Sequence, residues 1–160
     1  MKYRLFDSPV APLLLAGDDE GLRFVLFSRG RQSAQPPPDW QPDRGSLREA
    51  VRQLTAYFAG KLRSFDLPLA PRGTVFQQQV WRALQQIPYG ETASYGELAK
   101  RIGNPNAVRA VGLANGANPI SIIIPCHRVI GSNGSLTGYG GGLPIKRALL
   151  ALEQGRSSLF

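Results

Sequence analysis

The sequence predicts an α+β protein with a small N-terminal sheet domain and a second, mostly helical domain. Two apolar runs, 13–16 and 22–27, flank the turn-forming segment 17–21, which is typical of a β-hairpin. Apolar residues over 47–58 recur at helical spacing. Beyond the Pro-rich segment 66–73, helical spacing predominates. These observations predict a hairpin and one helix before the linker and most of the helices after it.

The composition limits the class of protein. With 160 residues, the chain is long enough for one ordinary domain or for a small domain joined to a compact one. Its 19 basic and 11 acidic residues favour a polyanionic partner such as nucleic acid or an anionic membrane surface, although solubility alone also explains them.

A single cysteine excludes an intramolecular disulfide and a four-cysteine zinc site. The N-terminus leads into no apolar stretch long enough for a signal peptide or a membrane span, so we expect a cytoplasmic protein with no membrane partner.

The N-terminal domain is predicted to occupy residues 1–65. A surface loop is expected at 35–39, where three consecutive prolines exclude helix interior. The helix of this domain is predicted to stop at Gly60. Residues 66–73 are assigned as an extended linker, which leaves 74–160 as the second domain.

The second domain begins with a predicted helix over 76–87, whose aromatic stripe we assign to the core. Ser94 is a good N-cap with Glu97 three residues on, which is the spacing of a capping box. The helix that starts there is broken at 103–106, and a helix rich in small residues follows over 107–115. Two short helices across a tight turn suggest a helix-turn-helix, although most such pairs are plain structural corners.

The rest of the second domain opens with the β-branched run 120–124, which we expect to be buried. Residues 131–142 form a glycine-rich loop around Tyr139. This loop lacks the Lys-Ser/Thr ending of a phosphate-binding loop, so a flexible segment carrying an aromatic lid is the better interpretation. A last helix, with a proline in its first turn, is predicted from Leu143 to about Glu153.

The only cysteine and the only histidine of the chain, Cys126 and His127, are neighbours. Random placement would put the two residues side by side in roughly one arrangement in eighty. A thiol becomes a nucleophile as the thiolate, and an imidazole that accepts its proton is the usual means. Consecutive residues in regular structure do not face each other, so the pair requires a bridging water or a bend at Cys126, which Pro125 favours. Glu153 is a distant candidate for the acceptor that orients the imidazole.

The alternative to a catalytic pair is a structural one. A buried cysteine packs as a small hydrophobic residue, and the histidine beside it then lies on the surface. The residue types alone leave both interpretations open.

The segment Pro125–Val129 resembles the active-site signature of the O6-alkylguanine-DNA alkyltransferases, also called methylated-DNA–protein-cysteine methyltransferases. Five further segments resemble this family in the expected order: 87–96, 109–112, 115–119, 138–139 and 146–153. The resemblance is dense from about Thr74 to Glu153 and loose over 1–65. It implies that the N-terminal domain is ribonuclease-H-like and that 74–160 is the catalytic, DNA-binding domain, with its active site at Pro125–Val129.

The resemblance implies a DNA repair reaction that consumes the protein. Cys126 would attack the alkyl carbon on O6 of guanine, and O4-alkylthymine would be a second substrate. His127 would take the thiol proton through a water, and Glu153 would orient His127. Because the thioether is stable and the chain has no second thiol, one irreversible transfer per molecule is expected.

The resemblance also assigns a substrate pocket. Asn118 would link the recognition helix to the active-site loop. Tyr95 would hydrogen-bond the guanine ring nitrogen and help to neutralise the leaving guanine. The pocket would be lined by the carbonyls of Cys126 and Val129, the ring of Tyr139 and the amide of Gly140.

DNA binding follows from the same resemblance. A base inside a duplex has to be flipped out to reach a buried thiol, and Arg109 matches the family's arginine that fills the gap left in the stack. The second helix of the helix-turn-helix would press into the minor groove of double-stranded DNA, where contact is nearly independent of sequence. Its DNA-binding residues would be Arg109, Ala110, Gly112, Ala114 and Asn115. The basic excess supplies the electrostatic attraction.

Two alternatives belong to other classes of protein. A non-enzymatic helix-turn-helix binder, whether a regulator or a lesion sensor, predicts that Cys126→Ser leaves all activity intact. A cysteine hydrolase that uses Cys126 and His127 predicts turnover of an ester or amide and no preference for DNA. The C-terminal motifs favour the alkyltransferase over both.

No metal or organic cofactor is implied, and we expect a monomer. The N-terminal domain is expected to be a structural support, with a surface that contacts neighbouring copies on DNA as the alternative.

Overall fold

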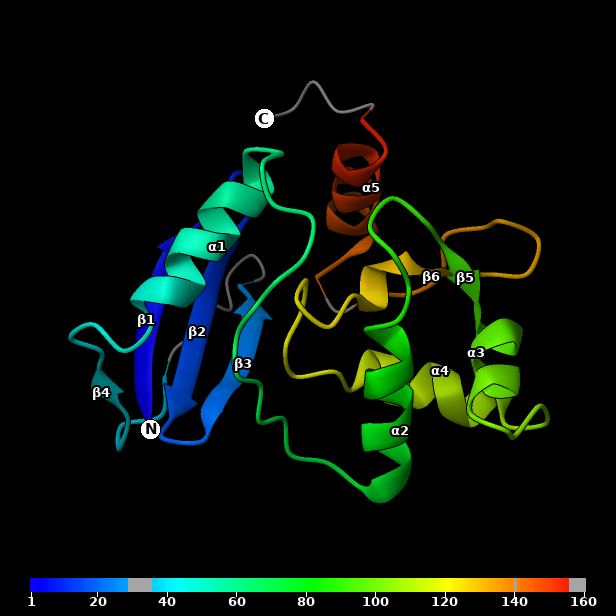
Figure 1. Ribbon diagram of the computed structural model, residues 1–160, viewed down its shortest axis with the longest axis horizontal. Helices are drawn as coiled ribbons and strands as arrows, with labels where there is room; N and C mark the ends of the chain where they lie inside the picture. Colours follow the sequence, from blue (N-terminus) through cyan, green and yellow to red (C-terminus); the bar gives the residue numbers. More distant parts are fainter. Residues whose placement is uncertain (29–35, 140, 156–160) are drawn as a thin grey trace.

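The computed structural model describes residues 1–28, 36–139 and 141–155, which form two domains (Figure 1). In the N-terminal domain a four-stranded sheet has the strand order β3-β2-β1-β4. Its strands are β1 (Lys2–Asp7), β2 (Pro12–Asp18), β3 (Gly21–Phe27) and β4 (Gln41–Pro42). The first three are antiparallel neighbours, and β4 runs parallel to β1. The helix α1 (Arg48–Phe58) lies across one face of this sheet.

The predicted hairpin is confirmed as β2 and β3, and β1 is an addition that the sequence does not indicate. This strand pairs with β2 along its whole length, from Lys2 opposite Gly17 to Asp7 opposite Pro12. All of its residues are exposed or half-buried. Because none of these residues is buried, the strand needs no apolar run, and its sequence lacks the pattern that marks an inner strand.

Residues 66–73 run in an extended form along β3. The amide of Leu22 donates to the carbonyl of Pro68 at 2.9 Å, and the amide of Ala70 donates to the carbonyl of Leu22 at 2.9 Å. Gly21 permits this approach, because its φ is +140° and a Cβ there would lie 2.6 Å from the Pro68 carbonyl oxygen. The segment between the two domains is therefore held against the sheet.

Helices dominate the second domain. Three of them, α2 (Val75–Leu84), α3 (Tyr95–Arg101) and α4 (Val108–Gly116), pack against one another, and α5 (Leu143–Glu153) follows near the C-terminus. The shorter elements are the parallel pair β5 (Ala93–Ser94) and β6 (Val129–Ile130) and the 3-10 turn η1 (Cys126–Arg128). The predicted capping box of Ser94 and Glu97 begins α3, and α3 and α4 form the predicted helix-turn-helix. Over the described ranges, no helix is both long and apolar enough to span a lipid bilayer.

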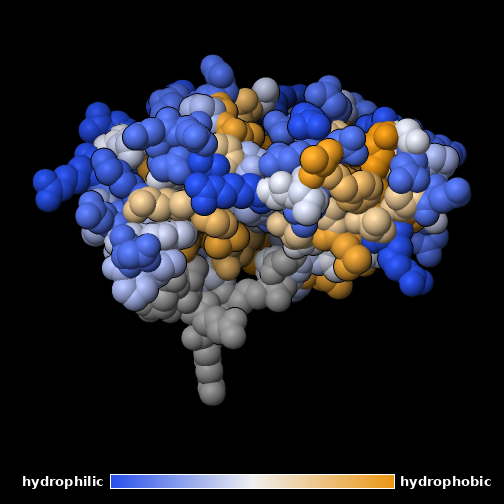
Figure 2. Space-filling view, turned by 90° about the horizontal axis from the view of Figure 1, so that it is seen from below, coloured by the Kyte–Doolittle hydropathy of each residue, from blue (hydrophilic) through white to orange (hydrophobic). Residues whose placement is uncertain are grey.

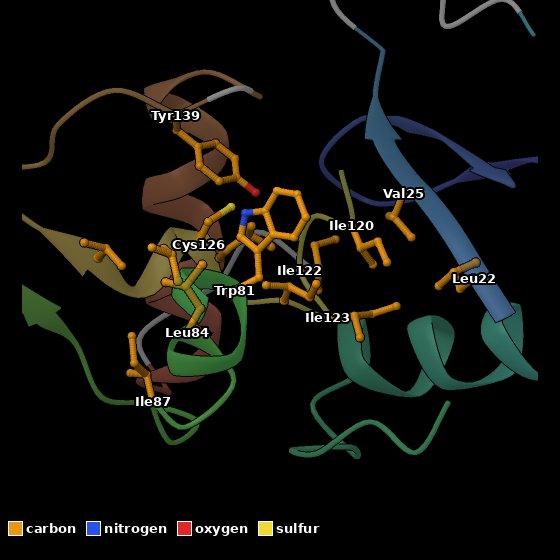
Figure 3. Packing of buried hydrophobic residues seen from close by; sticks show 14 of the residues in the cluster. Leu22, Val25, Trp81, Leu84, Ile87, Ile120, Ile122, Ile123, Cys126 and Tyr139 are labelled. Atoms are coloured by element: carbon orange, nitrogen blue, oxygen red, sulfur yellow. The ribbon is translucent and has the colours of Figure 1, made fainter. Parts of the chain in front are cut away.

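The run 120–124 joins the two domains. It is buried, as predicted, but it forms turns instead of a regular element. The amide of Val25 in β3 donates to the carbonyl of Pro119 at 2.9 Å, and the amide of Ser121 donates to the carbonyl of Val25 at 3.0 Å. Ile122 has a φ of 72°, which is a strained conformation for a β-branched residue. Figure 3 shows Ile120, Ile122 and Ile123 between β3 and the second domain, so one apolar core continues across both domains.

Candidate active site

The chain bends sharply at its only cysteine. Pro125 has a φ of −81° and a ψ of 64°, and the amide of Cys126 donates to the carbonyl of Ile124 at 2.8 Å. Cys126 then begins the single turn of η1. The turn follows directly on the buried run 120–124, so the side chains of Cys126 and His127 both lie inside the protein.

The thiol of Cys126 is almost completely buried, with 5% of the residue exposed. Burial raises the pKa of Cys126, while a hydrogen bond from Asn118 and the positive charge of Lys146 lower it in part. The group is therefore a protonated thiol at neutral pH, and it needs a base to become the thiolate nucleophile.

His127 can supply that base. Its Nε2 lies 2.7 Å from Oε2 of Glu153, and its ring is fully buried. Burial lowers the pKa of His127, although the neighbouring Glu153 favours the charged form. Because a carboxylate can only accept, the hydrogen of the neutral imidazole is assigned to Nε2, and Nδ1 keeps its lone pair. Within the part of the chain that the structure describes, Nδ1 has no hydrogen-bond partner, so this atom is available to accept a proton.

Glu153, at the end of α5, is the acceptor around which this cluster is built. Its carboxylate accepts from Nε2 of His127 (2.7 Å), the Arg128 guanidinium (2.7 and 3.1 Å), the Tyr57 hydroxyl (2.6 Å) and the Gly90 amide (3.4 Å). Burial acts to raise the pKa of Glu153, but the hydrogen bonds and charges of His127 and Arg128 outweigh it and hold the pKa well below its ordinary value. The carboxylate therefore stays ionised and is suited to orienting His127 rather than to taking up its proton.

Arg128 and Tyr57 also belong to this cluster, although neither was assigned a role from the sequence. Arg128 lies within Pro125–Val129, and that signature is the signal that could have identified it. It also donates to the carbonyl of Ile87 at 2.7 Å, and its guanidinium lies 5.8 Å from the centroid of the Tyr89 ring. Tyr57 comes from α1 in the other domain, so only the three-dimensional structure brings it here.

Asn118 follows α4 and fixes the buried run that leads to Cys126. Its Nδ2 donates to the carbonyl of Ile124 at 2.8 Å, and its Oδ1 accepts from the amide of Ile120 at 3.0 Å. One side chain therefore holds both ends of the run. The end of α4 is connected in this way to the turn that carries the thiol.

Tyr139 forms a wall beside the thiol. It is 9% exposed, and Figure 3 shows its ring directed toward Cys126 and Trp81. The negative charge of a Cys126 thiolate contributes to raising the pKa of Tyr139, after the larger effect of burial, which agrees with this proximity. Gly140, expected to form the next part of the wall, lies outside the described residues.

Two more of the expected pocket groups, the carbonyl of Val129 and the hydroxyl of Tyr95, already have partners. The carbonyl of Val129 accepts from Nζ of Lys146 at 2.6 Å, and the same ammonium donates to the carbonyl of Thr137 at 3.0 Å. The hydroxyl of Tyr95 lies 2.6 Å from Oγ1 of Thr137. Thr137 and the fully buried Lys146 therefore hold these groups in position, and neither was identified as functional from the sequence.

The expected DNA-binding residues of α4 do not all lie on one side. The exposed face of α4 consists of Arg109, Ala110, Leu113, Gly116 and the following Ala117. Ala114 and Asn115 are buried, and the carbonyl of Ala114 accepts from Nε1 of Trp81 at 2.9 Å. Gly112 is half-buried beside the ring of Tyr95. Ala114, Asn115 and Gly112 therefore lie off the exposed face, where they pack or support α4.

Leu113 stands out on the exposed face of α4, because 72% of this leucine is exposed. Val108 at the start of the helix is a second exposed apolar residue, at 42%. Figure 2, which views the molecule from below, shows apolar side chains grouped on its C-terminal half. Exposed apolar groups that gather in this way indicate a contact surface.

The two parts of the chain match two parts of one family. Residues 1–71 match the family described as 6-O-methylguanine DNA methyltransferase, ribonuclease-like domain. Residues 75–155 match 6-O-methylguanine DNA methyltransferase, DNA binding domain. A methylated-DNA–protein-cysteine methyltransferase of Methanosarcina acetivorans is 61% identical over 153 residues, covering 96% of this chain and 98% of that protein. The protein of the same name from Mycobacterium tuberculosis is 58% identical over 156 residues, covering 97% and 93%.

Solved structures have the same fold. The crystal structure of Mycobacterium tuberculosis OGT in complex with DNA matches with a TM-score of 0.90 and 57% identity, covering 98% of this chain and 95% of that chain. The O6-methylguanine-DNA methyltransferase from Pyrococcus kodakaraensis shares the fold with a TM-score of 0.66 and 24% identity, covering 95% and 98%. With matches to both domains and such identity over almost its whole length, the chain belongs to the 6-O-methylguanine DNA methyltransferase family.

Proposed function

We propose that this chain repairs DNA by transferring the alkyl group of O6-alkylguanine to its own Cys126. The observation that carries the proposal is the buried series of Cys126, His127 and Glu153, in which a thiol is followed by a neutral base and an ionised orienting acceptor. O4-alkylthymine, which presents the same alkyl–oxygen bond, is a second proposed substrate.

The proposed reaction starts with loss of the thiol proton. His127 accepts it at Nδ1 through a water, and the ionised Glu153 stabilises the resulting imidazolium through Nε2. Sγ of Cys126 then attacks the alkyl carbon. The new bond joins sulfur to carbon, the bond from carbon to O6 breaks, and its electron pair stays on guanine. Tyr95 is proposed to donate to the guanine ring nitrogen and so to help neutralise the leaving base.

Recognition of the flipped base is proposed to use groups that the structure holds in place. The carbonyl of Val129 accepts from Lys146, but a carbonyl oxygen has a second lone pair with which to accept from the exocyclic amine of guanine. Tyr139, beside the thiol, is proposed to cover the base. Gly140 is proposed to add its amide to the same wall.

The exposed face of α4 is proposed as the surface that enters the minor groove. Arg109 would fill the space that the flipped base leaves, and Leu113 would lie against sugars and base edges. Ala110 and Gly116 keep this face small enough for close approach. The net charge of +8 supplies attraction to phosphate that is independent of sequence.

The protein is proposed to act once, as a monomer in the cytoplasm, without a metal or organic cofactor. Its only thiol is the acceptor, and a thioether is stable, so nothing in the chain removes the alkyl group. The two domains are proposed to span residues 1–65 and 74–160, joined by the linker 66–73.

A stoichiometric titration tests this function. A duplex with one O6-methylguanine is mixed with increasing amounts of protein, and the remaining lesion is measured. One lesion lost per protein molecule, with no turnover, is the expected result. Cys126→Ser is expected to bind the duplex and remove no lesion. Lesion loss by Cys126→Ser, or repeated turnover by the unaltered chain, would contradict the proposal, and binding without lesion loss by the unaltered chain would favour a DNA-binding module.

A further inference from the structure

The N-terminal domain reaches into the catalytic cluster through one side chain. Tyr57 lies in α1, 96 residues before Glu153, and none of it is exposed. Its hydroxyl lies 2.6 Å from Oε2 of Glu153. The same oxygen lies 2.7 Å from Nε2 of His127. The hydroxyl and the imidazole therefore share one carboxylate oxygen.

The Tyr57 hydroxyl acts as a donor in this contact, because an ionised carboxylate can only accept. Burial raises the pKa of Tyr57 well above its ordinary value, and the adjacent negative charge of Glu153 raises it further. The phenol therefore keeps its hydrogen over the whole working pH range.

Aromatic packing fixes the direction of this hydroxyl. The centroid of the Tyr57 ring lies 5.3 Å from that of Phe58, 5.5 Å from that of Phe65 and 6.2 Å from that of Tyr89. Phe65 belongs to the segment that leaves the N-terminal domain, and Tyr89 belongs to the second domain. The ring is therefore held between the domains, so the hydroxyl remains directed at the carboxylate.

We propose that Tyr57 is a positioning residue for the alkyl transfer, through which the N-terminal domain helps Glu153 to orient His127. The inference rests on the proposed function and deepens it, because it concerns the base that activates Cys126. A domain whose strands and helix stand apart from the DNA-binding helices then contributes directly to the reaction rate.

Removal of the hydroxyl has a defined electrostatic consequence. Without this donor, the negative charge on Oε2 of Glu153 is compensated less. It therefore attracts the imidazole more strongly and stabilises the protonated form of His127. The pKa of His127 rises, and a smaller fraction of molecules holds the neutral base at a given pH. The acid limb of the pH–rate profile therefore moves to higher pH, and the rate loss becomes smaller as the pH rises.

Other ionisable groups also affect the pKa values of Tyr57, Glu153 and His127, and these groups remain in Tyr57→Phe. They are Arg128 from η1, Lys146 from α5 and Tyr89 before β5, and Tyr139 at the pocket in turn feels the charge of Glu153. Because Tyr57→Phe leaves all of them unchanged, a shift in the profile reports the missing hydroxyl.

The test is single-turnover transfer from a saturating O6-methylguanine duplex, measured between about pH 5.5 and 9 for the full-length unaltered chain and for Tyr57→Phe. A lost hydrogen bond to a charged group predicts a rate about 3- to 10-fold lower near pH 7, with the acid limb moved to higher pH. Leu54→Val is the matched control, since Leu54 is a fully buried residue of α1. Its side chain has no group that can hydrogen-bond to Glu153, so the variant tests loss of packing alone. It is expected to lower the stability of the domain and to leave the profile in place.

Each outcome bears on the inference. A lower rate with a shifted acid limb in Tyr57→Phe alone supports it. An unchanged profile in Tyr57→Phe, or the same shift in Leu54→Val, overturns it while leaving the proposed function intact. Absence of any transfer by the unaltered chain overturns the proposed function and this inference together.

Discussion

The cluster around Glu153 and the exposed face of α4 differ in where they place polar and apolar side chains. The cluster places a carboxylate, a guanidinium and an imidazole in the interior, each of them less than a tenth exposed. The exposed face of α4 carries Leu113 at 72% exposure and small residues, with Arg109 as its charged member. Polar and charged groups, which lose most by leaving water, are therefore inside the protein, and a large apolar side chain is exposed to water.

This contrast separates two tasks. Buried charges are costly unless each has partners, and the carboxylate of Glu153 has four donor groups, which fix the orientation of the base. The exposed face of α4 needs no internal partner, because its partner is another molecule. Substitutions in the cluster should therefore reduce both stability and rate, and substitutions on the face should reduce only the interaction with DNA.

Glu153→Gln is expected to have the largest effect. It leaves Arg128 in the interior without its counter-charge, and breaking a buried ion pair costs about 3–5 kcal/mol. The transfer rate is expected to fall as well, because His127 loses the ionised acceptor that stabilises its protonated form. Urea unfolding and single-turnover kinetics measure the two effects.

The matched control is Glu91→Gln, which neutralises an exposed carboxylate and is expected to change stability by less than about 0.5 kcal/mol. If both variants unfold at the same urea concentration as the unaltered chain, the ion pair of Glu153 and Arg128 does not stabilise the fold.

Leu113→Asp is expected to weaken DNA binding without affecting the fold. The new carboxylate repels phosphate and removes an apolar contact, so a loss of about 1–3 kcal/mol in binding is expected. Its unfolding free energy is expected to stay within about 0.5 kcal/mol of the unaltered value, because the residue is exposed.

Leu5→Asp is the comparison variant, since Leu5 is 60% exposed on β1 in the other domain. Fluorescence anisotropy with an O6-methylguanine duplex compares the two at several salt concentrations. Equal losses in both would show that net charge, and not the position on α4, determines binding.

Acidification is expected to give the smallest effect. Since burial lowers the pKa of His127 from 6.5, the unfolded chain binds a proton below about pH 6.5 that the folded chain does not. Stability is therefore full above that pH and decreases as the pH falls toward the folded pKa, by about 1.4 kcal/mol for each unit of lowering. The lowered pKa of Glu153 adds a second loss below about pH 4.5.

The assignment to one residue is testable because His127 is the only histidine. Urea unfolding between pH 5 and 7 is expected to show a slope in the unaltered chain and little slope in His127→Gln. The same slope in both proteins would rule out His127 as its source.

The sequence predicted those features that short segments determine. The capping box of Ser94 and Glu97 is complete within one helical turn, and the β2–β3 hairpin is complete within two neighbouring runs. The pair of Cys126 and His127 was found because both residues are unique in the chain. Each of these signals is local.

Long-range and pattern-poor features could not be predicted. The contact of Tyr57 with Glu153 joins residues 96 positions apart, and no periodicity encodes it. In α4, small residues occur on every side, so the sequence gives no apolar stripe from which to recognise that Ala114 and Asn115 are buried while Leu113 is exposed. The run 120–124 has the composition of a strand, but its pairing with Val25 is limited to a single bridge.

Transfer to Cys126 is tested most directly by mass spectrometry of the protein after mixing with a duplex whose O6-methylguanine carries a deuterated methyl group. Transfer predicts a mass gain of one deuterated methyl group in place of one hydrogen per chain, located on the peptide that contains Cys126. Loss of the lesion with an unchanged protein mass, or label on any other residue, would contradict it.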